Sequence, residues 1–133
     1  MIDYRETKIY TADELEDLFL SVEWSSGHYP DKLVVAMKNS DTVFSAWSED
    51  KLIGLINVLD DDIMTAYIHY LLINPEFQGE GIGGELVKRV AEKYKDYLRI
   101  VLVAYDEEIG FYENLGFEAG KDVTPLYITS LWT

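Results

Sequence analysis

The sequence lacks several features that would define a function class. It has no cysteine, which excludes disulfides, thiolate metal sites and a cysteine nucleophile. Basic residues are scarce, because 11 Lys and Arg stand against 25 Asp and Glu, a net charge of −14. Nucleic-acid binding depends on neutralising phosphates with Lys and Arg, so we expect no nucleic-acid partner. No apolar run approaches the roughly 20 residues of a membrane span and no signal pattern opens the chain, so we expect no membrane association and a cytoplasmic location.

The rest of the composition is typical of a globular domain. Hydrophobic residues make up 48% of the 133 residues and aromatic residues 14%, which is enough to build a packed core. A chain of this length usually forms one domain. No repeat, linker or low-complexity tract divides it, so we expect a single domain over residues 1–133.

Hydrophobic periodicity and turn residues predict an alternation of helices and strands. The clearest helix start is Thr11, because Glu14 three residues later completes a capping box. The clearest helix body is residues 81–97, which place apolar residues at helical spacing on one face. The predicted helices are residues 11–22, a short segment after Pro30, residues 81–97 and residues 109–115. The predicted strands are residues 42–48, 51–59, 63–73 and 100–103, Phe117, and residues 126–132.

The order of these elements predicts the fold class. Residues 42–59 form two strands around a very short turn, which requires an antiparallel pair. A helix separates residues 63–73 from residues 100–103, and a strand–helix–strand order requires a parallel pair. We therefore expect an α/β domain with a mixed sheet, antiparallel in its first half and with a parallel pair in its second half, flanked by helices. Residues 100–103 are wholly apolar, which predicts a strand buried on both faces.

A glycine-rich segment, residues 78–84, separates the third long β-rich run from the longest predicted helix. Glycines allow sharp turns and close approach of a ligand, and the first N–H groups of the following helix carry a partial positive charge. Together they predict a site for phosphate or pyrophosphate, with a ligand-free turn as the alternative. The segment is not a Walker loop, because no Lys-Ser or Lys-Thr pair follows it, and its glycine spacing does not fit a dinucleotide fingerprint.

Two motifs together resemble the GNAT superfamily of N-acetyltransferases. Gln78, Gly81 and Gly83 fit its acetyl-CoA loop, whose core is Gln/Arg-x-x-Gly-x-Gly/Ala, and residues 111–117 resemble its second signature, Phe-Tyr-x-x-x-Gly-Phe. The motifs occur in the expected order with a predicted helix and strand between them. The resemblance covers about residues 51–118 and implies an acetyl-CoA-dependent N-acetyltransferase with a GNAT-like sheet.

The resemblance also assigns the cofactor site and a catalytic residue. It implies that the strand ending at Ile73 binds the pantetheine arm, that the glycine-rich segment holds the pyrophosphate, and that Tyr112 is the general acid. Two positions depart from the pattern, because Glu80 stands where many relatives carry Lys or Arg, and Tyr105 where many carry a cofactor-contacting Asn. The residues placed at the cofactor are Leu71, Leu72, Ile73, Gln78, Gly79, Glu80, Gly81, Ile82, Gly83, Gly84 and Phe111.

A candidate general base follows from strand geometry. Only a neutral amine can attack a thioester, yet a free alkylammonium has a pKa of about 10. Alternate residues of a regular strand share a face, so we expect Tyr67 and His69 on the side of Leu71 and Ile73. His69 is the candidate base, directly or through a water molecule. A structural histidine and a separate water chain are the alternatives.

Two further groups of residues lie where an acceptor could be recognised. By the resemblance, the connection between the first two helices, with Trp24, His28 and Tyr29, shapes the acceptor site. Ordinary packing is the alternative, and it is the interpretation that we prefer for Trp24. The acidic turn at residues 60–62 is either a solvated turn or an electrostatic lure for a cationic amine.

The sequence thus predicts an N-acetyltransferase that moves an acetyl group from acetyl-CoA to the primary amine of a small, cationic acceptor. We expect direct attack within a ternary complex and no metal. A non-catalytic acyl-CoA-binding module and an acidic protein-interaction domain are the alternatives. Residues 126–132 would suit an exchange or edge strand, which leaves a homodimer open.

Overall fold

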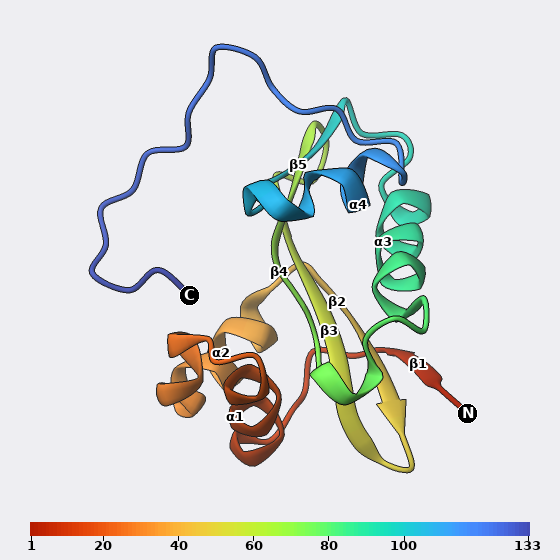
Figure 1. Cartoon of the computed structure of the whole chain (residues 1–133), viewed down its shortest axis with the longest axis vertical. Helices are drawn as coiled ribbons and strands as arrows, with labels where there is room; N and C mark the ends of the chain where they lie inside the picture. The colour runs from red at the N-terminus through yellow and green to blue at the C-terminus, as the bar shows by residue number, and fades with distance from the viewer.

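A five-stranded mixed sheet lies at the centre of the structure, a computed structural model that describes all of residues 1–133 (Figure 1). Neighbouring strands pair in chain order, antiparallel from β1 to β4 and parallel between β4 and β5. The expected fold class is therefore confirmed. The strands are β1 (Asp3–Glu6), β2 (Thr42–Ser48), β3 (Lys51–Asp60), β4 (Thr65–Ile73) and β5 (Arg99–Leu102).

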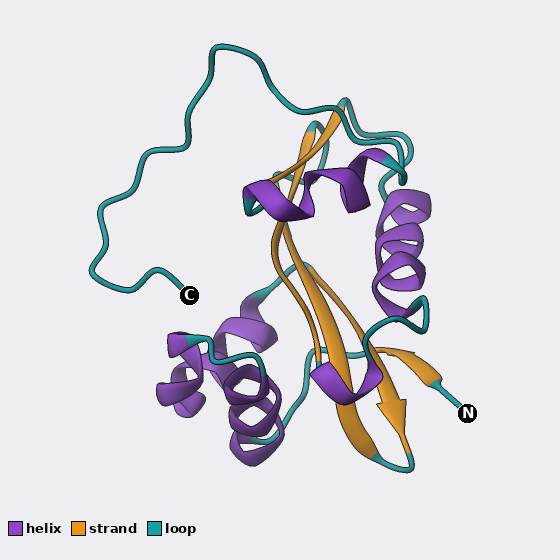
Figure 2. Ribbon diagram, in the orientation of Figure 1, coloured by secondary structure: helices purple, strands orange, loops and turns teal.

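Helices cover both faces of the sheet (Figure 2). α1 (Ala12–Ser21) and α2 (Pro30–Asn39) pack on one face, while α3 (Ile82–Lys93) packs on the other, which produces two separate hydrophobic cores. None of the helices has the length and apolar character that a membrane crossing requires. The short elements are η1 (Ser25–His28), η2 (Pro75–Phe77), η3 (Asp106–Glu108) and α4 (Ile109–Glu113).

Local sequence signals fix the ends of several elements. The predicted capping box is present, since the Glu14 N–H donates to Thr11 Oγ1 at 3.1 Å and the Thr11 N–H to Glu14 Oε1 at 2.9 Å. β4 starts two residues later than predicted because Asp61 Oδ1 accepts the N–H groups of residues 63–65 and holds them in a turn. α3 ends at Lys93, four residues before the predicted end at residue 97. The next residue, Tyr94, donates its hydroxyl to the Asp60 carboxylate at 2.6 Å.

A bulge in β4 overturns the expected alternation of its side chains. Ile56 pairs with Leu71 and Val58 with Ile68, so β4 carries one residue more than β3 between these pairs. The buried Asn57 side chain holds the bulge by accepting the Tyr70 N–H at 2.8 Å. Ala66 and Ile68 therefore face the α3 core together with Leu71 and Ile73, while Tyr70 and Leu72 face the α1–α2 core. Tyr67 and His69 do not share a face with Leu71 and Ile73, and that prediction is wrong.

The end of the chain differs from the prediction. The expected strands at Phe117 and residues 126–132 do not form, and residues 118–133 instead arch away from the body (Figure 1). β5 is therefore an edge strand whose residues are exposed or half-buried, so the prediction that residues 100–103 are buried on both faces is wrong. A strand needs a neighbour for its main-chain hydrogen bonds, and these segments find none within the chain.

Candidate active site

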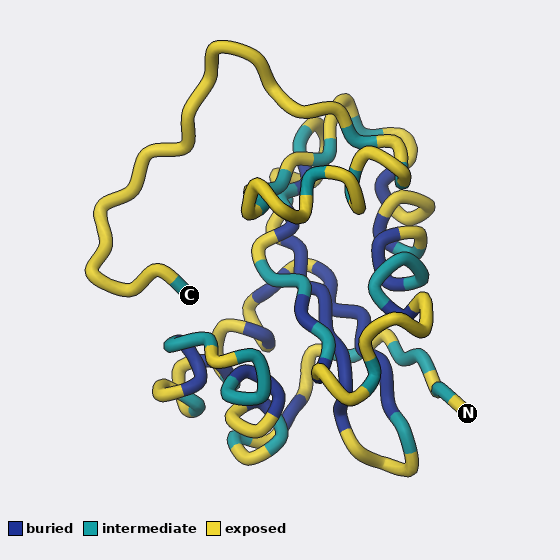
Figure 3. The backbone as a smooth tube through the Cα atoms, in the orientation of Figure 1, coloured by how far each residue is buried: buried dark blue, intermediate teal, exposed yellow.

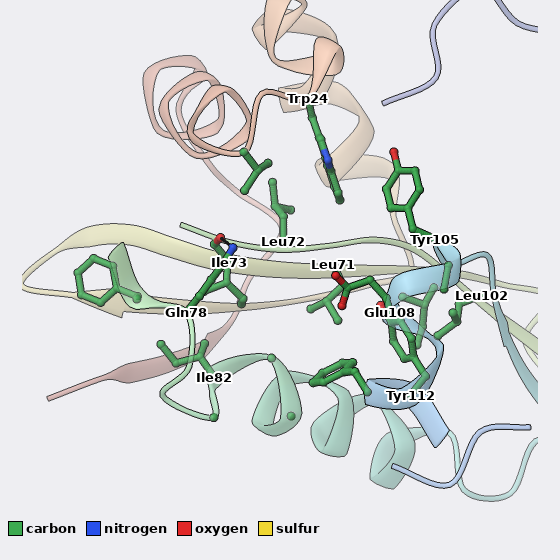
Figure 4. Close-up of a pocket in the computed structure, with 18 of the residues that line it drawn as sticks. Trp24, Leu71, Leu72, Ile73, Gln78, Ile82, Leu102, Tyr105, Glu108 and Tyr112 are labelled. Atoms are coloured by element: carbon green, nitrogen blue, oxygen red, sulfur yellow. Dashed lines mark hydrogen bonds between the residues drawn. The ribbon is translucent and has the colours of Figure 1, made fainter. Parts of the chain in front are cut away.

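A pocket of about 530 Å³ opens where β4 and β5 end, and it brings most of the predicted site together (Figure 4). Fourteen of its 21 lining residues are hydrophobic. The walls come from β4, the glycine-rich segment, the end of β5, the η3–α4 segment and the connection after α1. The predicted site residues that line it are His69, Leu71, Leu72, Ile73, Gln78, Gly79, Gly81, Ile82, Gly83, Gly84, Phe111 and Tyr112.

The pocket exists because β4 and β5 pair along only part of their length. The parallel ladder joins residues 65–68 to residues 99–102 and then stops. Residues 71–73 of β4 continue to pair with β3 on one side, but their other edge faces the pocket without a strand partner. Main-chain donors and acceptors along such an edge can bind an extended ligand as a further strand would.

The glycine-rich segment forms an open cradle at the start of α3. Gly79 and Gly81 have φ angles of +82° and +81°, a conformation that other residues adopt only with strain. A Cβ atom at either position would meet nothing within 4 Å, so the space beside them is empty. The N-terminus of α3 has no side-chain cap, which leaves its first N–H groups for a ligand. This arrangement suits a phosphate or pyrophosphate group.

Side chains next to the cradle hold it in place. Gln78 Nε2 donates to the main-chain oxygen of Ile73 at 3.0 Å, which ties the segment to the end of β4. Asn74 Oδ1 accepts the Glu76 N–H at 2.9 Å and fixes the turn between them. On the far side, a Cβ atom at Gly83 would lie 3.3 Å from the Phe111 ring, so the glycine allows α3 and α4 to pack closely.

Glu80 is the one predicted cofactor residue that does not line the pocket. Its side chain is exposed, so its charge acts on a bound anion through solvent. We expect Glu80→Lys to tighten acetyl-CoA binding by a few-fold at low salt, and the gain to shrink as salt rises. Titration calorimetry at two salt concentrations measures this effect. Glu16→Lys on the exposed surface of α1 makes the same change in net charge, and an equal gain there would contradict a local effect.

Tyr112 stands in the pocket wall, as the resemblance implies. Its ring packs edge-on against Phe111 at 5.0 Å and Phe117 at 5.7 Å, measured between ring centroids. The hydroxyl makes no hydrogen bond within the protein, and it is not sealed from solvent. Burial, assisted by the nearby Glu108 carboxylate, raises the pKa of Tyr112 to about 12. The phenol is therefore protonated throughout the neutral range and has its proton free to donate.

Glu108 is a pocket residue that the sequence analysis missed. It carries the only carboxylate or permanent charge among the lining residues, and its side chain points from η3 towards Leu71, beside Tyr112 (Figure 4). A signal for it exists, because Glu108 precedes Tyr112 by four residues and a helical turn places such residues on the same side. That signal is weak, because Glu108 stands in an acidic run, residues 106–108, and most charge runs are solvated.

A row of aromatic rings borders the pocket on the α1–α2 side of β4. His69 stacks on Tyr70 at 4.1 Å and on Tyr67 at 5.7 Å, and Trp24 lies 6.0 Å from Tyr70. Burial lowers the pKa of His69, which favours the neutral imidazole that can accept a proton. Trp24 lines the pocket as the resemblance implied, whereas Tyr67, His28 and Tyr29 do not.

The acidic turn after β3 has a structural role in this fold. The Asp61 carboxylate accepts hydrogen bonds from the main-chain N–H groups of residues 63–65. These bonds lower the pKa of the Asp61 carboxyl, and the Thr65 N–H has the largest effect, followed by those of Met64 and Ile63. Asp60 accepts the Tyr94 hydroxyl. None of the three aspartates lines the pocket. The structure therefore favours a turn with a structural role over a cluster that attracts a cationic acceptor.

The sequence is similar to those of known acetyltransferases. The model of the acetyltransferase (GNAT) family matches residues 9–117. GCN5-related N-acetyltransferase 2, chloroplastic, from Arabidopsis thaliana is 40% identical over 76 residues, which are 56% of this chain and 30% of that protein. The chain spans less than half the length of the first plant relatives that it matches.

Solved structures resemble the chain over nearly its whole length. A GNAT-family acetyltransferase from Streptococcus pneumoniae TIGR4 superposes with a TM-score of 0.83 at 25% identity, covering 98% of this chain and 99% of that one. An acetyltransferase from Clostridium acetobutylicum, solved with acetyl-CoA, superposes with a TM-score of 0.72 at 18% identity, covering 96% of each chain. At that identity, the second likeness concerns the fold alone.

Proposed function

Because the chain belongs to the acetyltransferase (GNAT) family, we propose that it transfers an acetyl group from acetyl-CoA to the primary amine of a small, cationic acceptor. The observation that carries the proposal is the single pocket that joins the glycine cradle, the free edge of β4 and the Tyr112 hydroxyl. In acyl-CoA the pyrophosphate would use the glycine cradle, the pantetheine arm the free strand edge, and the thioester sulfur the proton donor.

The residues present fit the shape and the main-chain hydrogen-bonding groups of acetyl-CoA. The empty space at Gly79 and Gly81 and the uncapped start of α3 would hold the pyrophosphate. The free main-chain edge at residues 71–73 would align the pantetheine arm, and its N–H groups would polarise the thioester carbonyl. When bound, acetyl-CoA supplies the acetyl group in activated form.

Tyr112 is proposed to supply a proton at the sulfur that leaves. A pKa of about 12 lies above that of a cysteine thiol, about 8.5, so full transfer of the proton to an alkyl thiolate is uphill. The hydroxyl therefore acts first as a hydrogen-bond donor to the developing negative charge. Packing of its ring against Phe111 and Phe117 positions the hydroxyl in advance of the reaction.

Glu108 supports a cationic acceptor, because a carboxylate inside a largely apolar pocket favours a positively charged ligand. The amine that attacks must be neutral, so the charge paired with Glu108 would belong to a second ammonium group. We expect Glu108→Gln to raise the KM for a linear diamine by about tenfold, which corresponds to about 1.4 kcal/mol. The monoamine of equal chain length is the control, and an equal change for both amines would contradict the assignment.

His69 is proposed to take the amine proton, either directly or through water. Its pKa is held below the ordinary value, so it is neutral at pH 7 and gains a proton only as the pH falls. The rate should therefore fall on the acidic side of the profile, through the lowered pKa of His69. We expect this acidic limb to disappear in His69→Ala, together with a loss of rate at neutral pH. An unchanged limb in a pH–rate profile would assign the proton to another route.

A screen of primary amines tests the proposal as a whole. Release of free thiol from acetyl-CoA, followed with a thiol reagent, is expected to depend on the amine and to be fastest with small polycations. The chain has no cysteine of its own to react with the reagent. Binding of acetyl-CoA without amine-dependent thiol release across the panel would favour a non-catalytic acyl-CoA-binding module. Absence of acetyl-CoA binding would favour an acidic interaction domain.

A further inference from the structure

Two aromatic side chains and one carboxylate from different parts of the chain meet in the pocket. Trp24, Tyr105 and Glu108 all line it. Trp24 enters from the connection after α1, whereas Tyr105 and Glu108 come from the segment that follows β5. In the close-up the Trp24 ring is directed into the pocket, the Tyr105 ring extends towards it, and the Glu108 carboxylate lies in the same space (Figure 4).

The protein holds these groups in place before a ligand binds. The Trp24 ring packs edge-on against Phe19 at 6.2 Å and lies 6.0 Å from Tyr70, measured between ring centroids. The main-chain oxygen of Tyr105 accepts the Glu108 N–H at 2.9 Å, so these two residues belong to one turn. That turn lies at the surface (Figure 3), and the Tyr105 side chain is 51% exposed. The set therefore combines a packed inner ring with a second ring and a carboxylate at the rim.

Such a set favours a weakly hydrated cation. The face of a Trp ring is the best side-chain partner for a cation, and a Tyr ring is also suitable. A primary ammonium has three N–H donors, which lose hydrogen bonds to water on entering a largely apolar pocket. Fourteen of the 21 lining residues are hydrophobic, and Glu108 is the only lining carboxylate. A trimethylammonium group carries the same charge and has no N–H donor to leave unpaired.

We propose that the acceptor carries a quaternary or N-methylated ammonium group at the end remote from its primary amine, and that Trp24, Tyr105 and Glu108 bind this group. Trp24 supplies the inner ring face, Tyr105 a second ring at the rim, and Glu108 the compensating charge. The inference rests on the proposed function for the fate of the primary amine, whereas binding of the remote cation requires no acetyl transfer.

Three acceptors of equal chain length test the preference. Each has a primary amine at one end, and the other end is a trimethylammonium, an ammonium or a tert-butyl group. The tert-butyl group has the shape of trimethylammonium without its charge. We expect the KM to be lowest for the trimethylammonium compound, about 5–30-fold below that of the tert-butyl compound. Equal KM values for these two, or a lower KM for the ammonium compound, would overturn the proposal.

Substitutions assign the preference to the rings. Trp24→Leu should remove most of the difference in KM between the trimethylammonium and tert-butyl compounds, and Trp24→Phe should remove less because it keeps a ring. Tyr105→Leu should reduce the difference, whereas Tyr105→Phe should preserve it. Trp132→Leu is the control, because Trp132 is exposed and does not line the pocket. A full preference in both leucine variants of the pocket would contradict the assignment.

Binding without turnover separates this proposal from acetyl transfer. Calorimetry in the presence of CoA compares choline with its neutral isostere, in which a tert-butyl group replaces trimethylammonium. Neither compound has a primary amine. We expect choline to bind at least about fivefold more tightly than the isostere, and Trp24→Leu to abolish the difference. Equal binding, or no binding of choline, would overturn the cation site even if amines release thiol from acetyl-CoA. Preferential binding of choline without thiol release for any amine would support the cation site and contradict the proposed function.

Discussion

Tyr112→Phe is expected to lower kcat by about 10²–10⁴-fold while leaving acetyl-CoA affinity nearly unchanged. The substitution removes one oxygen and keeps the ring that packs between Phe111 and Phe117. The lost hydroxyl makes no hydrogen bond within the protein, so stability should change little. Its effect should therefore appear in the chemical step, where the departing sulfur loses its proton donor. Steady-state rates with the best amine, together with calorimetry for acetyl-CoA, measure the two quantities separately.

Tyr105→Phe is the matched control for this experiment. Tyr105 also lines the pocket and also carries a phenol, but it is half-exposed at the rim. A small effect there and a large one at Tyr112 would locate the proton donor. If the Tyr112 variant is as fast as the parent, the sulfur leaves without help from this hydroxyl and the assignment of the general acid is wrong.

Gly81→Val is expected to weaken acetyl-CoA binding by about 10–100-fold. The φ angle of +81° is unfavourable for a β-branched residue, and its side chain would enter the empty space of the cradle. Hydrogen bonds to a charged group are worth about 1.5–3 kcal/mol each, so losing one of them accounts for a change of this size.

Gly116→Val separates the two effects. Gly116 has a φ angle of +98°, and a Cβ atom there would also meet nothing within 4 Å, but this glycine follows α4 and does not line the pocket. Both variants should lose similar stability in thermal melts, and only Gly81→Val should lose acetyl-CoA affinity. Equal affinity in the parent and Gly81→Val would show that the pyrophosphate does not lie in this cradle.

Much of the fold could be predicted because its signals are local. The capping box of Thr11 and Glu14 and the apolar face of α3 each depend on residues within one or two turns. The strand–glycine–helix order placed the cradle at the end of β4 for the same reason. The sequence therefore predicts residues 78–84 at the ligand site, and the structure places all of them in the pocket lining except the exposed Glu80.

Features that depend on distant residues were missed. No glycine or proline marks the β4 bulge, which is held by the side chain of Asn57 on the neighbouring strand. β1 is only four residues long, Asp-Tyr-Arg-Glu, and has no apolar alternation that would reveal it. Residues 126–132 have the composition of a strand, but strand propensity does not say whether the chain provides a neighbour for it.

Thiol release measured while both acetyl-CoA and a small polycationic amine are varied tests the central claim most directly. Direct transfer in a ternary complex predicts intersecting double-reciprocal lines, no thiol release without amine, and a product heavier than the amine by one acetyl group. Parallel lines would indicate a covalent acetyl-enzyme and contradict direct attack. No amine-dependent release with any amine, in a protein that binds acetyl-CoA, would contradict acetyl transfer itself.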